Sequence, residues 1–255
     1  MIRRTAIRLV VLLAVCVAPW LARADLPDTI ERIKPSIVVV GTFNKLRSPP
    51  FILRGTGFVV ADGSLIATNA HVLPDPGKDP AEALMVLARV GNNPQPREVR
   101  LLQRDDDHDL AVLRLIGPPL PAMTLADAVT VREGQSIAFT GFPIGGALGF
   151  APVTHRGILA AITPIALPGG NATELKDRSI RRLRTGSFPI YQLDATAYPG
   201  NSGGPLYDAE TGSVIGIINM VFVKSTKEAV LEKPSGITYA IPAEHLRRLL
   251  NEVKP

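Results

Sequence analysis

Ser202 lies in a segment whose residue types suit a reactive loop better than a helix or a regular strand. The segment runs from Gly200 to Pro205 and reads GNSGGP, so three glycines and a proline accompany one hydroxyl group. A serine hydroxyl is a weak nucleophile at neutral pH, so an imidazole must accept its proton and return it to the leaving group. Glycines beside the serine let backbone N–H groups converge on a developing oxyanion, and Gly200 and Ser202 are the expected donors.

Three interpretations of this loop compete: a plain glycine turn, the G-x-S-x-G elbow of an α/β-hydrolase, and the nucleophile loop of a chymotrypsin-like fold. A hydrolase elbow connects a strand to a helix, and its acid and histidine follow the serine in the chain. Here the loop is followed by a turn, DAETG, and another strand. The one histidine after the serine is His245, which we expect on the surface of a C-terminal helix. The context therefore argues against the elbow.

A histidine and an aspartate precede the loop in the order that a chymotrypsin-like site requires. His71 ends the apolar segment SLIATNAHVL, and Asp109 begins the apolar segment DLAVLRLI. A lone histidine on an apolar strand is usually a core residue, but the order His, Asp, Ser favours a catalytic role for His71. His108 is disfavoured because neighbouring strand residues point to opposite faces, and His155 has no acid nearby in the sequence. Asp107 remains an alternative for the acid.

The aspartates around position 107 also raise the question of a metal site. Asp105, Asp107 and Asp109 alternate as the ligands of a calcium loop do. An EF-hand loop needs glycine at its sixth position and glutamate at its twelfth, which here are Leu110 and Ile116. We therefore expect neither a metal nor another cofactor.

Short apolar runs separated by Gly, Pro, Asn and Asp make up most of the chain and predict an all-β fold, a sandwich or a barrel. The expected strands are residues 36–43, 55–61, 64–73, 110–116, 136–142, 213–223 and 236–242. Residues 28–35 predict a short helix. Residues 242–253 predict a C-terminal amphipathic helix with Leu246, Leu249, Leu250 and Val253 on one stripe. Residues 74–80 and 168–187 are expected to be surface loops.

The first 24 residues have the pattern of a signal peptide. Three arginines precede the apolar segment LVVLLAVCVA, and Ala22 and Ala24 fit a signal peptidase site. Ten apolar residues are too few to span a bilayer, so we expect cleavage before Asp25, no stable membrane span, and a periplasmic or secreted protein. Lipid attachment at Cys16 is disfavoured because Val15 occupies a position that calls for a small residue.

Cleavage would remove four arginines and the only cysteine. The remaining 231 residues carry 24 basic and 23 acidic side chains, a net charge of +1, and they are numerous enough to fold around a core without disulfides. This balance gives no support for a nucleic-acid partner. The basic segment 176–184, KDRSIRRLR, is expected to be a solvated loop because it lacks interleaved aromatic residues.

The motifs taken together resemble the HtrA (Deg-type) family of trypsin-like serine proteases. GTGFVVADGSLIATNAHV resembles its His motif, HDLAVLRL its Asp motif and YQLDATAYPGNSGGPLYD its nucleophile motif. IERIKPSIVVV, GFPIGGALGFAPVTHRGILAAI and GITYAIPAEHLRRLL resemble its entry segment, its Gly-Pro-rich segment and its closing strand and helix. The resemblance implies a chymotrypsin/trypsin-like double β-barrel with a C-terminal helix, which would occupy residues 25–255. His71 and Asp109 would come from the first barrel and Ser202 from the second.

The resemblance also implies a function: serine endopeptidase activity on polypeptides, acting on exported or misfolded proteins. The alternative is a catalytically silent binding protein on the same fold. A homo-oligomer is compatible with the resemblance. The sequence ends where the family's PDZ domain would begin, so peptide sensing by that domain is not carried over. Asn201 replaces the aspartate of zymogen-type trypsins, so we expect no proteolytic activation.

The expected substrate pocket carries no charge. Its floor should be Thr196, six residues before the nucleophile, followed by Ala197. A wall should come from Asn219, Met220 and Val221. A pocket for Arg or Lys would need a buried carboxylate, because burying an unpaired cation is costly. The composition therefore predicts cleavage after small or aliphatic residues.

Overall fold

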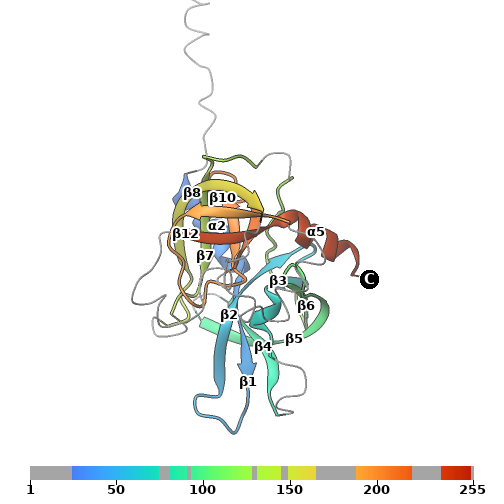
Figure 1. Cartoon of the computed structure of the whole chain (residues 1–255). Coiled ribbons are helices and arrows are strands. Elements are labelled where there is room, and N and C mark those ends of the chain that lie inside the picture. The colour runs from blue at the N-terminus through green and yellow to red at the C-terminus, as the bar shows by residue number, and fades with distance from the viewer. Residues whose placement is uncertain are drawn as a thin grey trace, which may run out of the picture.

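The computed structural model describes residues 25–74, 81–90, 93–127, 131–144, 149–164, 188–219 and 237–253. Figure 1 shows two β-barrels that follow one another along the chain, with the C-terminal helix beside both. The expected all-β double barrel with a C-terminal helix is confirmed.

The first barrel is closed in the strand order β1-β2-β3-β6-β5-β4, and all its neighbouring strands are antiparallel. Val, Ile and Leu dominate the inward positions because branched side chains fit the pleated, buried face of a strand. The strands are β1 (Ile37–Phe43), β2 (Phe51–Val60), β3 (Leu65–Thr68), β4 (Ala83–Val90), β5 (Asn93–Asp105) and β6 (Leu110–Leu115).

The second barrel repeats this arrangement with the order β10-β11-β12-β9-β8-β7. Its strands are β7 (Ser136–Gly141), β8 (Val153–Pro164), β9 (Pro189–Asp194), β10 (Pro205–Asp208), β11 (Val214–Asn219) and β12 (Ile237–Pro242). The nucleophile loop of the sequence analysis lies between β9 and β10.

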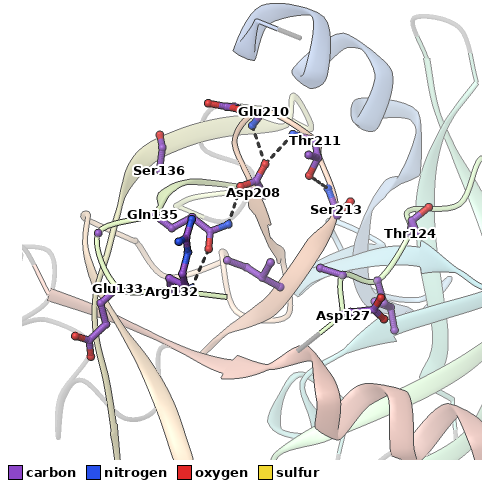
Figure 2. Close-up of a pocket in the computed structure, with 14 residues that line it drawn as sticks. Thr124, Asp127, Arg132, Glu133, Gln135, Ser136, Asp208, Glu210, Thr211 and Ser213 are labelled. Carbon is purple, nitrogen blue, oxygen red and sulfur yellow. Dashed lines mark hydrogen bonds between the residues drawn. The ribbon is translucent and has the colours of Figure 1, made fainter. Parts of the chain in front are cut away.

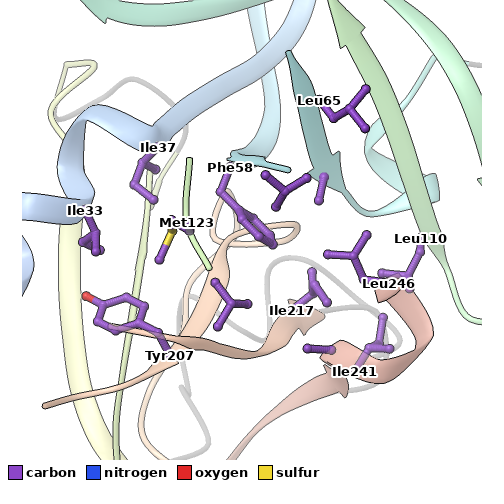
Figure 3. Close-up of a cluster of buried hydrophobic side chains, with 14 of the residues drawn as sticks. Ile33, Ile37, Phe58, Leu65, Leu110, Met123, Tyr207, Ile217, Ile241 and Leu246 are labelled. Carbon is purple, nitrogen blue, oxygen red and sulfur yellow. The ribbon is translucent and has the colours of Figure 1, made fainter. Parts of the chain in front are cut away.

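An apolar cluster joins the two barrels. Phe58 of β2 and Leu110 of β6 belong to the same cluster as Tyr207 of β10 and Ile217 of β11, and all four are fully buried (Figure 3). Each barrel also has its own interior cluster. Because apolar burial is the main favourable term in folding, the shared cluster fixes how the barrels face each other.

Short helices tie both ends of the described chain to the barrels. Helix α2 (Leu26–Ile33) is capped by Asp25 and continues into the 3-10 helix η1 (Lys34–Ser36). Thr29 and Arg32 donate to the backbone carbonyls of the β10–β11 turn, at 3.0 and 2.6 Å. Helix α5 (Ala243–Asn251) packs against β6, β11 and β12.

The predicted apolar stripe on helix α5 is confirmed, but the predicted surface position of His245 is wrong. Leu246 and Leu249 are buried, and Leu250 and Val253 pack partly against the shared cluster. His245, expected on the surface, is only 4% exposed because its ring packs against His108 and Phe188.

Several strands were not predicted. The apolar runs predicted none of strands β4, β5, β8, β9 and β10: β4 also suits a helix, and β5 contains two prolines and is mostly exposed. The expected strand 64–73 ends at Thr68, and the chain then turns into the 3-10 helix η2 (Ala70–Val72). Of the expected loop 74–80 only Pro74 is described, and the expected loop 168–187 lies outside the described residues. Within the described residues, no helix is long and apolar enough to cross a membrane.

Candidate active site

His71 lies in η2, directly after β3, and not on the strand itself. Two hydrogen bonds to one carbonyl hold this turn in place. The backbone N–H of Ala70 and the side-chain amide of Asn69 both donate to the Asp109 carbonyl, at 3.1 and 3.0 Å. Asn69 and Ala70 are buried, so the backbone beside His71 is rigidly placed.

Asp109 ends the turn between β5 and β6 with a positive φ of 56° and is 3% exposed. Its two carboxylate oxygens both contact His71. Oδ2 lies 2.6 Å from His71 Nδ1, and Oδ1 accepts the His71 backbone N–H at 2.9 Å. This bidentate contact fixes the position and orientation of the imidazole.

Asn219, at the end of β11, supplies a further partner for this carboxylate. It is fully buried, and its Nδ2 donates to Asp109 Oδ2 at 2.7 Å. Burial alone would raise the pKa of Asp109, but the hydrogen bonds from His71 and Asn219 outweigh it and hold that pKa below its ordinary value. Asp109 is therefore held as a carboxylate.

From its place in the sequence, Asn219 was expected in the wall of the substrate pocket, and its contact with Asp109 was not predicted. Its side-chain Nδ2 donates to Asp109, while its place in the pocket wall stays a prediction. Residues 110 positions apart gave no local signal for the contact. The order of strands in the second barrel, which places the end of β11 against the first barrel, could have suggested it.

Ser202 is 6% exposed and lies in a loop that is bonded to both barrels. Its carbonyl accepts the backbone N–H of Thr56 at 2.9 Å, and the Thr56 hydroxyl donates to the Gly200 carbonyl at 2.7 Å. The N–H of Gly203 donates to the Ile218 carbonyl at 2.9 Å. The loop is thus anchored between β2 of the first barrel and β11 of the second.

Two glycines allow the loop to approach the His71 segment. Gly203 has a φ of 84°, and a Cβ there would lie 2.2 Å from the Thr56 carbonyl oxygen. A Cβ on Gly55 would lie 2.6 Å from the Val72 side chain and 2.9 Å from the Ser202 carbonyl oxygen. Gly55 therefore touches the residue after His71 on one side and Ser202 on the other.

The peptide between Pro199 and Gly200 has a fixed orientation. The Pro199 carbonyl accepts the Ile144 N–H at 2.7 Å. In a trans peptide the carbonyl and the N–H point in opposite directions, so the Gly200 N–H points away from Ile144. Within the described residues this N–H has no hydrogen-bond acceptor.

The alternative histidines and acids of the sequence analysis, all of them described, do not join the His71–Asp109 pair. His108 Nδ1 lies 2.6 Å from Asp105 Oδ2, and its ring stacks on His245 at 4.0 Å. The carboxylate that contacts His71 belongs to Asp109, and Asp107 instead donates its backbone N–H to Asp105. His155 was set aside for lack of a nearby acid, and the structure places it beside Asn201 in the nucleophile loop.

Part of the expected substrate pocket is described. Thr196 is half-buried, and Ala197 is buried with its N–H donating to the Thr238 hydroxyl at 3.0 Å. Met220 and Val221 lie outside the described residues, as does the basic segment 176–184.

A separate cavity of about 860 Å³ lies between the linker of the barrels and the second barrel (Figure 2). It includes none of the expected site residues. Asp208, on its wall, accepts from the Gln135 side chain at 2.6 Å and from the backbone of Glu210 and Thr211 at 3.1 and 2.8 Å. These bonds show that the Asp208 carboxylate stabilises the turn that follows β10.

Among the described residues, no group of three His, Cys, Asp or Glu is arranged to hold a metal ion.

Known proteins share this sequence and architecture. A probable periplasmic serine endoprotease DegP-like from Halomonas elongata is 32% identical over 190 residues, which are 74% of this chain and 33% of that protein. Serine protease HTRA3 from Rattus norvegicus is 29% identical over 232 residues, 88% of this chain and 43% of that protein. The chain therefore spans less than half the length of these relatives.

A solved structure described as the HtrA-type protease AlgW with tripeptide is 26% identical, with a TM-score of 0.63. The match covers 90% of this chain and 63% of the solved one. The resemblance to HtrA proteases is confirmed over most of the sequence. The trypsin-like peptidase domain matches residues 55–217, and the chain belongs to this family.

Proposed function

We propose that this protein is a serine endopeptidase in which Ser202 attacks the peptide carbonyl. The observation that carries the proposal is the buried chain of hydrogen bonds from Asn219 through Asp109 to His71. Because Nδ1 of His71 donates to Asp109, Nε2 is the nitrogen that can accept the Ser202 proton. Asp109 stays ionised and stabilises the imidazolium that forms, which then protonates the leaving amine.

The N–H groups of Gly200 and Ser202 would bind the oxyanion of the tetrahedral intermediate. The bond from Ile144 to the Pro199 carbonyl supports this role, because it turns the Gly200 N–H away from Ile144, and among the described residues that N–H has no acceptor. One such donor is worth about 3 to 4 kcal/mol of transition-state stabilisation.

Substrates would be polypeptides cleaved after small or aliphatic residues. Thr196 and Ala197 bring no charge to the expected pocket floor, and the proposed wall of Met220 and Val221 is apolar. Discrimination among aliphatic residues would be about 10- to 200-fold per methylene. A peptide library derived from a proteome maps the preference, and selection of Arg, Lys, Asp or Glu would refute the pocket assignment.

Export would bring the enzyme to its substrates, which would be exported or misfolded proteins. Residues 1–24 carry the signal-peptide pattern, and one relative is named periplasmic. The intact mass of protein recovered from the periplasm should correspond to a chain that begins at Asp25. A mass that retains Cys16 with a lipid would contradict this cleavage site.

Casein digestion by the mature protein tests the proposed activity, with Ser202→Ala as the control. The variant should keep the circular dichroism spectrum of the wild type and lose cleavage. Equal digestion by both proteins would refute the assignment of Ser202. Absence of cleavage by both, together with no labelling by a fluorophosphonate, would favour the silent binding protein.

A further inference from the structure

We propose that His155 is a positioning residue for the nucleophile loop: its neutral imidazole accepts a hydrogen bond from the Asn201 side chain. The inference rests on the proposed function of that loop. His155 Nε2 lies 3.5 Å from Asn201 Nδ2, and Asn201 directly precedes Ser202. The contact joins β8 to the segment that would form the oxyanion site.

The His155 ring is held by aromatic packing. It stacks on Phe139 of β7, with ring centroids 4.8 Å apart and planes 17° apart, and the two residues are paired across the strands. Phe139 is fully buried, so it offers a fixed platform. The Tyr198 ring lies 6.0 Å away on the loop side. The orientation of the imidazole is therefore fixed by packing within the second barrel, independently of its contact with the loop.

Asn201 depends on this contact. Asn201 is fully buried, and its backbone closes the loop through two hydrogen bonds. The Asn201 N–H donates to the Tyr198 carbonyl at 3.0 Å, and the Asn201 carbonyl accepts the Gly204 N–H at 2.9 Å. The side-chain Oδ1 is buried without a partner, so within the described residues the amide is held through His155. A buried amide that loses its remaining bond carries an added desolvation cost.

The contact operates in one protonation state. An amide nitrogen only donates, so Nε2 of His155 must accept, and the ring is neutral with its proton on Nδ1. Burial lowers the pKa of His155 and keeps it neutral. In the described structure Tyr198 on the loop is the titratable group that faces the ring, Arg156 is its neighbour on the same strand, and Asp194, at the end of β9, pairs with Ile158 further along β8. Arg156 and Asp194 are exposed.

The expected consequence concerns turnover more than binding. Asn201 lies between Gly200 and Ser202, whose N–H groups are the proposed oxyanion donors, so a loose Asn201 side chain would misplace these donors. Interactions made only in the transition state change kcat and leave KM nearly unchanged. The substrate pocket residues Thr196 and Ala197 lie outside this contact.

Two variants separate the hydrogen bond from the packing. His155→Phe keeps a ring on Phe139 and removes the acceptor, and we expect kcat to fall about five- to tenfold at constant KM. His155→Gln restores an acceptor and should recover most of the lost kcat. Arg156→Gln, on the exposed neighbour, should behave as the wild type. Wild-type kcat in His155→Phe, or equal losses in the Phe and Gln variants, would overturn the inference.

A measurement without turnover protects the test against misfolded variants. Long-range ¹H–¹⁵N correlation spectra of ¹⁵N-histidine-labelled Ser202→Ala protein at neutral pH report the tautomer of each ring. We expect His155 to show an unprotonated Nε2 and a protonated Nδ1, and a protonated Nε2 would overturn the inference. If Ser202→Ala itself cleaves casein, the proposed function fails. If that variant is inactive while His155→Phe has wild-type kcat, the positioning role alone fails.

Discussion

His245→Met should remove much of the acid sensitivity of the fold. His245 is 4% exposed, and within the described part of the chain neither of its ring nitrogens has a hydrogen-bond partner. A carboxylate oxygen of Glu244 lies 3.6 Å from Nε2. Burial, followed by the charges of His108 and Arg248, lowers its pKa from 6.5 to about 4, against a smaller opposing effect of Asp105. Protonation would place a cation against the stacked His108 ring and Phe188.

The sign follows from the lowered pKa. The unfolded chain binds the proton near pH 6.5 and the folded chain only near pH 4, so stability is fully present above pH 6.5 and is lost as the pH falls toward 4. The shift corresponds to about 2 kcal/mol at pH 5 and to about 3 kcal/mol once both states are protonated. Carboxylates with lowered pKa values, such as Asp109 and Asp208, lose their contribution only at lower pH.

Urea unfolding at pH 7.5 and pH 5 measures this effect, in a Ser202→Ala background that prevents autolysis. The parent chain should lose about 2 kcal/mol more between the two pH values than His245→Met does. The lowered pKa of His155 acts equally in both proteins and cancels in the difference. Equal losses in the two proteins would show that His245 is not held neutral by the fold, and would refute the reasoning.

Three further predictions concern the candidate site. Asn219→Ala should lower kcat about tenfold or more, because a hydrogen bond to a buried carboxylate is worth about 1.5 to 3 kcal/mol; an unchanged kcat would argue against a role for this bond. Gly203→Ala should lower the melting temperature far more than Gly134→Ala, since both have positive φ but only Gly203 faces a carbonyl oxygen, at 2.2 Å from the added Cβ. EDTA should leave casein cleavage unchanged, because proton transfer to His71 activates Ser202; lost activity restored by a metal would contradict this mechanism.

The sequence was most informative where one face of an element is buried. Strand β1, IVVVGTF, is buried along nearly its whole length, and its continuous apolar run predicted it. Strand β5 has mostly exposed or half-buried side chains, so no apolar pattern marks it, although its pairing with β4 and β6 closes the first barrel. Local pattern thus reveals buried strands, and pairing between distant segments determines the rest.

The same distinction applies to the candidate site. The types and order of His71, Asp109 and Ser202 were readable because their chemistry is local to each motif. The contacts of Asn219 and His155 were not, because the first depends on how the two barrels face each other and the second on how β8 lies against the nucleophile loop. The burial of His245 was missed for a related reason: its ring lies against His108, from a turn of the first barrel.

The most direct test of the central claim is to map the adduct of a fluorophosphonate probe by peptide mass spectrometry. The probe reacts with a serine whose hydroxyl is activated by a neighbouring base, so it reports the nucleophile without any assumption about substrate. We predict a single adduct on Ser202 in the wild type and its loss in His71→Ala. An adduct on another residue, or equal labelling of Ser202 in His71→Ala, would contradict the proposed mechanism.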